Sequence, residues 1–115
     1  MDLKSYNFDA FNEYTPFGIC DAIKSLNVNC NALTIACIGS DLVLGDSLGP
    51  MVGTFIKEGC KSSYVYGTLK SPITAKDVDY LSLYLKKIHL NSLVVSVDAA
   101  VGNKRDVGTI KVINR

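Results

Sequence analysis

The apolar residues of this chain fall into short blocks whose spacing alternates between helical and extended. The first block follows Pro16, a residue type that suits the first turn of a helix. Its apolar residues recur at about three-residue spacing and predict a helix that ends near Leu26: Phe17, Cys20, Ile23 and Leu26. Residues 1–15 are mixed in polarity, and we expect an N-terminal arm there for which the pattern predicts no packing.

From residue 33 onward, strand-like apolar runs alternate with amphipathic helical segments. Strands are expected over 33–38, 63–66, 93–97 and 107–113, and helices over about 48–59 and 76–89. The runs over 33–38 and 93–97 are apolar almost throughout, as in strands that a parallel sheet covers on both faces. The apolar faces expected of the two helices are Met51, Val52, Phe55 and Ile56 in the first, and Val78, Leu81, Leu85 and Ile88 in the second.

This alternation predicts an α/β fold, a three-layer α/β/α domain with a mainly parallel sheet and right-handed crossovers. If the strand over 33–38 lies between those over 63–66 and 93–97, the two crossover helices cover opposite faces of the sheet. A crevice then opens at the carboxyl ends of the strands over 33–38 and 93–97, where such folds bind ligands. The length of 115 residues fits one domain over 1–115.

Two aspartates, Asp46 and Asp98, are expected to meet in this crevice. Asp46 lies in the loop after the strand over 33–38, and Asp98 ends the strand over 93–97. Two carboxylates in one site cannot both ionise freely, so they can act as a shared-proton acid/base pair. The same pair could instead hold a divalent cation, and either carboxylate could simply cap a helix or turn.

The loop from Gly39 to Pro50 is rich in glycine, which lets backbone N–H groups approach an anion at a helix N-terminus. Its spacing matches neither the dinucleotide-binding fingerprint nor the Walker pattern, whose lysine is missing, so nucleotide binding is disfavoured. Around the two aspartates, the residues expected to contact a substrate are Gly39, Ser40, Asp41, Gly45, Ser47, Gly67 and Thr68.

Composition and charge disfavour several classes of protein. Twelve basic and eleven acidic residues give a net charge of +1, without the basic stripe that nucleic-acid binding needs. No run approaches the ~18 apolar residues of a membrane span, and the N-terminus lacks an apolar signal region, so we expect a cytoplasmic protein with no membrane partner. The four cysteines form no C-x-x-C pair, so a zinc ribbon is not expected. Their scattered positions suit a protein of a reducing compartment better than one held by disulfides.

His89 is the only histidine. It is expected at the end of the helix over 76–89, away from the crevice, where it interacts favourably with the helix dipole. With no second histidine, the chain lacks the base of a serine-hydrolase site and the ligands of a histidine-rich zinc site, so neither is expected. Tyr64 and Tyr66 are expected to pack rather than to bind substrate.

Four blocks occur in order along the chain: Cys-Ile-Gly-Ser-Asp at 37–41, Gly-Asp-Ser-Leu-Gly-Pro at 45–50, Val-Tyr-Gly-Thr-Leu at 65–69 and Val-Asp-Ala at 97–99. Over about residues 33–113, the chain resembles the YyaC family of sporulation proteins from spore-forming Firmicutes. That family is similar in turn to the germination protease that degrades small acid-soluble spore proteins, and more distantly to hydrogenase maturation endopeptidases. The resemblance implies a phosphorylase/hydrolase-like fold of peptidase type, and a place in the cytoplasm of a sporulating cell or forespore.

The germination protease has one aspartate before Ala-Leu-Gly-Pro and a second in a Val-Asp-Ala block, positions that Asp46 and Asp98 match. The resemblance therefore implies aspartic-type hydrolysis of a protein or peptide, with no resident cofactor. The maturation endopeptidases bind nickel through acidic residues at these two places and a later histidine. No histidine follows Asp98 here, so nickel recognition of that kind is not expected.

Three functional hypotheses stay open at this point. The cleft could be a peptidase-like active site, a non-catalytic sporulation or binding site for a peptide or divalent metal, or a carboxylate metal site of unknown use. YyaC-like proteins continue past the last strand, whereas this sequence stops at Arg115, so we expect either a fragment or a short family member. The physiological substrate and the oligomeric state remain open.

Overall fold

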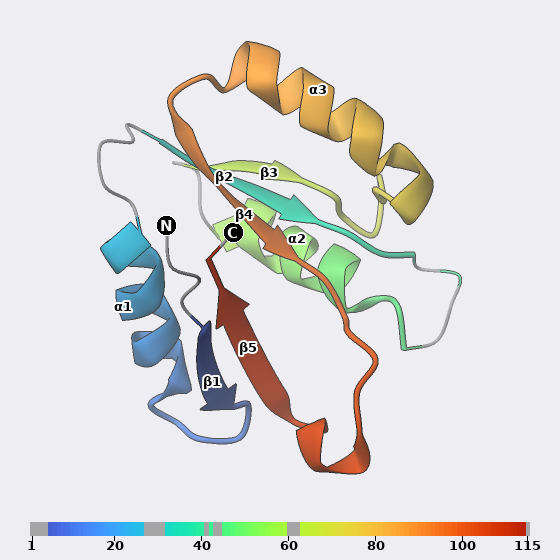
Figure 1. Cartoon of the computed structure of the whole chain (residues 1–115). Coiled ribbons are helices and arrows are strands. Elements are labelled where there is room, and N and C mark those ends of the chain that lie inside the picture. The colour runs from blue at the N-terminus through green and yellow to red at the C-terminus, as the bar shows by residue number, and fades with distance from the viewer. Residues whose placement is uncertain (1–4, 27–31, 41, 43–44, 60–62, 115) are drawn as a thin grey trace. The chain divides into compact units, whose positions relative to one another are not determined.

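The computed structural model describes residues 5–26, 32–40, 42, 45–59 and 63–114 (Figure 1). The chain forms two compact units, one made of residues 1–29 with 101–115 and the other of residues 30–100. The larger unit carries both aspartates of the predicted crevice. The expectation of a single domain over 1–115 stays a prediction.

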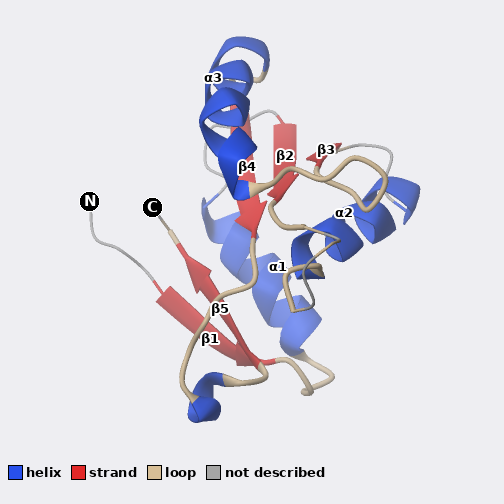
Figure 2. Ribbon diagram, turned by 90° about the vertical axis from the view of Figure 1, so that its right-hand side faces the viewer, coloured by secondary structure: helices blue, strands red, loops and turns tan. Residues whose placement is uncertain are grey.

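The larger unit is a three-stranded parallel sheet flanked by helices, which confirms the predicted α/β fold. Its elements in chain order are β2 (Ala32–Cys37), α2 (Leu48–Gly59), β3 (Tyr64–Tyr66), the 3-10 turn η1 (Ala75–Asp77), α3 (Val78–Ile88) and β4 (Ser92–Val97). The strand order is β3-β2-β4, as predicted. α2 and α3 lie on opposite faces of this sheet, as Figure 2 shows in a view turned from that of Figure 1.

The central strand β2 is the most deeply buried element. Its last four residues, from Thr34 to Cys37, are buried, which confirms the expectation of a strand covered on both faces. The hydroxyl of Thr34 is fully enclosed and shares a hydrogen bond of 2.6 Å with the Ser92 hydroxyl at the start of β4. A buried hydroxyl without such a partner would cost about 1–3 kcal/mol, so this bond keeps the polar residue compatible with the core.

α2 packs on the sheet through its smallest residues, which corrects the predicted apolar face. Gly49, Pro50 and Gly53 are buried, whereas Met51 and Phe55 are 43% and 70% exposed. The other two residues expected on that face, Val52 and Ile56, are half-buried. The reason is that the α2 backbone lies directly against neighbouring backbone. A Cβ atom at residue 53 would lie 1.8 Å from the Gly67 carbonyl oxygen, and one at residue 49 would lie 2.1 Å from the Ile38 carbonyl oxygen.

α3 buries a narrower stripe than its sequence pattern predicts. Leu85 is buried and Leu81 half-buried, but Val78 is 38% and Ile88 58% exposed. β4 is also only partly covered, because Val94 and Ser96 are exposed on the strand that was expected to be buried on both faces. These residues, apart from Ile88, line a cavity between α3 and the sheet.

The smaller unit contains β1 (Ser5–Asp9), α1 (Thr15–Leu26), the 3-10 turn η2 (Lys104–Asp106) and β5 (Thr109–Ile113). β1 and β5 pair antiparallel, so the predicted arm contains a strand that its mixed polarity did not indicate. In α1, Thr15 and Ala22 are buried while Phe17 and Cys20 are exposed, contrary to the predicted stripe. The Phe8 ring occupies the space over Gly18, where a Cβ would lie 2.4 Å from a ring carbon.

We expect Gly53→Ala to lower the free energy of unfolding by about 1–3 kcal/mol, because the added methyl group meets a backbone carbonyl that cannot rotate away. Gly59→Ala is the matched control at the end of the same helix, since nothing lies within 4 Å of a Cβ there. This control should be neutral or slightly stabilising. Urea unfolding followed by circular dichroism measures both variants, and equal stability of the two would contradict the close packing of α2.

Candidate functional site

The backbone of Asp46 is held against the end of β2. The Ser40 N–H donates a hydrogen bond of 3.0 Å to the Asp46 carbonyl oxygen. A Cβ at residue 39 would lie 2.3 Å from that same oxygen and 2.8 Å from Cδ of Pro50, so a side chain larger than hydrogen does not fit there. Gly39 therefore lets the loop return closely enough to place Asp46 beside the strand end.

Asp98 adjoins the same strand end through β4. Val97 is the register partner of Cys37, and the Ile38 N–H donates a 2.8 Å hydrogen bond to the Val97 carbonyl oxygen. Asp98 follows directly and is exposed, whereas Asp46 is half-buried. Both aspartates thus lie in segments that adjoin the carboxyl end of β2, as the strand order predicted.

The capping roles considered for these residues are not seen in the described part of the chain. There, neither the Asp46 nor the Asp98 carboxylate accepts a hydrogen bond. The Ser47 hydroxyl contacts the Met51 sulfur at 3.8 Å, and the Ser47 carbonyl oxygen accepts a 3.0 Å hydrogen bond from the Met51 N–H. The two carboxylates are left without a structural bond to any residue that the structure describes.

Gly67 and Thr68, predicted to contact a substrate, have clear structural roles. Gly67 adopts a φ of +94°, and a Cβ there would lie 1.9 Å from the Cys37 carbonyl oxygen. Thr68 is buried and forms two hydrogen bonds with Ser71. The Thr68 N–H donates to the Ser71 carbonyl oxygen at 3.2 Å, and the Ser71 N–H donates to the Thr68 hydroxyl oxygen at 3.1 Å. These contacts explain both residue types, and a role in substrate binding stays a prediction.

The remaining predicted contact residues lie in the loop between β2 and α2. Gly45 is exposed with a φ of +89° and open space where a Cβ would stand. The Ser40 hydroxyl accepts the Leu42 N–H at 3.1 Å. Asp41 lies outside the described residues. Substrate contact by Gly39, Ser40, Asp41, Gly45 and Ser47 also stays a prediction.

The segment from Leu69 to Thr74 forms a further wall of this site, and the sequence pattern did not predict its residues 70–74. Ile73 forms a parallel bridge with Ile38, and its carbonyl oxygen accepts the Gly39 N–H at 2.9 Å. At the next residue, the Asp77 carboxylate accepts hydrogen bonds of 3.0 Å from both the N–H and the hydroxyl of Thr74. The sequence signal was the Thr-x-x-Asp spacing before a helix, which is typical of a capping box.

Thr54 connects this wall to α2. Its hydroxyl donates to the Pro50 carbonyl oxygen at 2.9 Å and accepts the Leu69 N–H at 2.9 Å. One side chain therefore satisfies polar groups on both segments. The wall and α2 are consequently fixed to each other beside the Asp46 loop.

A second polar cluster surrounds His89, which follows α3 as its C-cap. Nε2 of His89 lies 2.7 Å from the Tyr66 hydroxyl, and the His89 ring stands 4.4 Å from the Tyr64 ring, centroid to centroid. Burial, and next the neighbouring Tyr84, raise the pKa of the Tyr66 phenol. The expected position at the helix end is confirmed, and the tyrosines do pack, but the hydrogen bond between Tyr66 and His89 was not anticipated.

Other titratable groups offer less chemistry. The Cys37 side chain is fully buried, and burial raises the pKa of its thiol, as in structural rather than reactive cysteines. Among the residues that the structure describes, no group of three or more His, Cys, Asp or Glu side chains is placed to hold a metal ion. None of the described helices has the length and apolar character needed to cross a membrane.

Comparison with known proteins places the chain in a family. A family model described as "Protein of unknown function (DUF1256)" matches residues 5–115. The chain belongs to this family. It is 37% identical over 81 residues to the protein named "Uncharacterized protein YyaC" of Bacillus subtilis (strain 168), a match that covers 70% of this chain and 40% of that relative. The resemblance to YyaC is thereby confirmed.

A second match is more limited. The human "Adhesion G protein-coupled receptor E3" is 34% identical over 87 residues, or 76% of this chain, but only 11% of the receptor is covered. The chain thus spans less than half the length of either curated relative. No solved structure matches the chain significantly. A relation of this DUF1256 member to the germination protease or to the maturation endopeptidases stays a prediction.

We expect Tyr66→Phe to lower the free energy of unfolding by about 1 kcal/mol, because the variant loses the hydrogen bond to His89. In Tyr66→Phe, the free energy of unfolding should also fall less steeply above about pH 10 than in the wild type. The folded pKa of Tyr66 lies above its ordinary value of 10.0, so the unfolded chain releases this proton first as the pH rises. The contribution is complete below pH 10 and is lost as the pH rises through the folded pKa.

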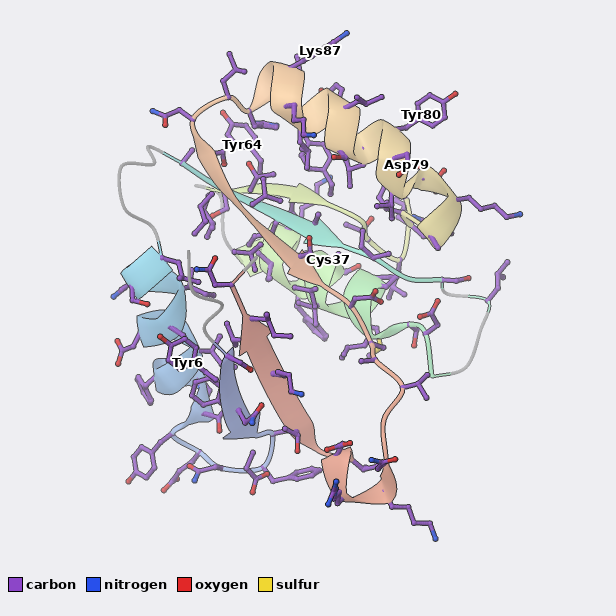
Figure 3. The ribbon with its side chains drawn as sticks, in the orientation of Figure 1. Tyr6, Cys37, Tyr64, Asp79, Tyr80 and Lys87 are labelled. Carbon is purple, nitrogen blue, oxygen red and sulfur yellow. The ribbon has the colours of Figure 1, made fainter. Side chains whose placement is uncertain are left out.

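Tyr80→Phe is the control, because Tyr80 is 80% exposed and points away from the sheet (Figure 3). Urea unfolding of the wild type and both variants over the range of about pH 8 to pH 11 measures the effect. An identical pH dependence in Tyr66→Phe and Tyr80→Phe would contradict the interaction.

Proposed function

We propose that this member of the DUF1256 family hydrolyses peptide bonds with Asp46 and Asp98 as its acid/base pair. The observation that supports the proposal is the position of both residues at the end of β2. Asp46 adjoins this strand end because its carbonyl oxygen accepts a hydrogen bond from the Ser40 N–H. Asp98 adjoins it because the preceding residue, Val97, accepts a hydrogen bond from the Ile38 N–H. Such an end of a parallel sheet is where α/β folds bind ligands.

The proposed reaction needs one ionised and one protonated carboxyl group. The ionised carboxylate takes a proton from a water molecule, whose oxygen attacks the peptide carbonyl carbon and forms the new C–O bond. The protonated carboxyl group gives its proton to the leaving amine nitrogen as the C–N bond breaks. In this proposal, Asp46 and Asp98 supply the two carboxyl groups.

The resemblance to YyaC-like sporulation proteins supports the same proposal, because the sequence blocks around Asp46 and Asp98 also resemble those of the germination protease. On this basis we propose that the protein acts on a protein or peptide in the cytoplasm of a sporulating cell or forespore. The chain spans 40% of the YyaC protein that it matches, so the activity of the whole protein is part of the proposal.

A second candidate is a binding site without catalysis, for a peptide or a divalent cation. The exposure of Asp98 favours this alternative, because an exposed carboxylate is accessible to an amine or a cation. In this alternative the aspartates contribute charge, and no peptide bond breaks.

Incubation of the protein with casein and with a peptide mixture, followed by mass spectrometry of new termini, tests the two candidates. We expect Asp46→Asn and Asp98→Asn each to lower the cleavage rate by about 10²–10⁴-fold, the usual contribution of a general acid or base. Asp79→Asn is the control, an exposed carboxylate in the first turn of α3 (Figure 3). It should cleave like the wild type.

Two outcomes would contradict the catalytic proposal. One is cleavage that persists in both Asp46→Asn and Asp98→Asn while the variants remain folded. The other is the absence of new termini in the wild type, with peptide binding that depends on the two carboxylates; that result would favour the binding site.

A further inference from the structure

An open groove of about 460 Å³ lies between α3 and the sheet in the larger unit. Its floor is formed by β2 and β4, and its roof by α3. The lining residues are Ala36, Ile38, Val78, Leu81, Ser82, Leu85, Lys86, His89, Leu90, Ser92, Val94 and Ser96. We call this feature the α3 groove. Most of its lining is aliphatic, so it suits an apolar ligand segment.

One end of the α3 groove is lined by Ile38 and Ser96, near the carboxyl ends of β2 and β4. Ile38 lies between the end of β2 and Gly39, and Ser96 stands two residues before Asp98. The groove therefore follows β4 from the segment beside Asp98 back to Ser92, where the strand begins. At about 3.3 Å per residue, this six-residue strand extends for roughly 20 Å, enough for several residues of an extended peptide.

The other end of the α3 groove carries positive charge. Lys86, in the last turn of α3, lines the groove, and the lining residues include no aspartate or glutamate. His89 lies at the same end, where Nε2 is engaged by the Tyr66 hydroxyl at 2.7 Å. An occupant with a carboxylate near Lys86 would be complementary in charge, and a second cation there would be repelled.

We propose that the α3 groove binds an apolar segment of the peptide substrate and that Lys86 recognises an acidic residue at the end of that segment. The inference rests on the proposed function, since it is the proximity of the groove to Asp98 that makes a peptide the occupant. It defines the substrate class further, as peptides in which leucine-like side chains are followed by a carboxylate.

Fluorescence polarisation with two labelled peptides tests this recognition. Both carry three leucines on a polar glycine-serine spacer, and they differ only in a following glutamate or lysine. The wild type should bind the glutamate peptide about tenfold more tightly, a difference of 1.4 kcal/mol. Lys86→Glu should reverse this preference.

Lys87→Glu is the matched control, because the neighbouring lysine does not line the groove and points to solvent away from the sheet (Figure 3). It should keep the wild-type preference. Equal binding of the two peptides by the wild type, or an equal effect of Lys86→Glu and Lys87→Glu, would overturn the proposal, because either result indicates general surface charge.

A second variant tests the site itself. Ser82 is exposed on α3 and lines the groove, so Ser82→Trp should obstruct it without disturbing the buried core. Binding of the glutamate peptide should fall at least tenfold while the urea unfolding midpoint stays near that of the wild type. Undiminished binding in this folded variant would overturn the assignment of the peptide to the groove.

The groove and the proposed catalysis fail separately. Binding with the expected charge preference but no hydrolysis leaves the groove in place and removes the catalytic proposal. Hydrolysis without preference between the two peptides contradicts the proposed role of the groove and leaves the proposed catalytic pair intact.

Discussion

Backbone packs directly against backbone where α2 crosses the carboxyl ends of β2 and β3, and the rest of the larger unit depends on this contact. Gly53 allows the helix to meet the Gly67 carbonyl, and Gly67 in turn allows its own segment to meet the Cys37 carbonyl. Protein interiors transmit such constraints because they are close-packed. The same device at Gly39 lets the loop carrying Asp46 return to the strand end, so the candidate site is a consequence of how closely the layers approach.

The two faces of the sheet differ in how they are covered. On one face, α2 leaves no room for an added Cβ at its buried glycines. On the other face, α3 leaves an open groove of about 460 Å³, the α3 groove. The tightly packed face can position the Asp46 loop, while the open face can accept an apolar ligand segment. Both functions adjoin the end of β2, which links the proposed chemistry to the proposed recognition.

Much of the larger unit could be predicted from the sequence because strand and helix periodicities are local signals. The strand order, and the placement of Asp46 and Asp98 beside one strand end, followed from the alternation of elements. The buried faces of the helices did not, since Met51 and Phe55 look like core residues unless the backbone contacts of Gly53 are known. The bond between Tyr66 and His89 was missed for a related reason, because it joins residues whose approach only tertiary packing determines.

The most direct test of the central claim, that Asp46 and Asp98 share one cleft, is a double-mutant cycle on the free energy of unfolding at neutral pH and low salt. Two carboxyl groups in one cleft interact unfavourably, so Asp46→Asn and Asp98→Asn should each relieve the same interaction. The account predicts that the double variant gains less stability than the two single variants together, with a coupling of at least about 0.5 kcal/mol. Additivity within about 0.3 kcal/mol would contradict it, because distant and independent sites behave in that way.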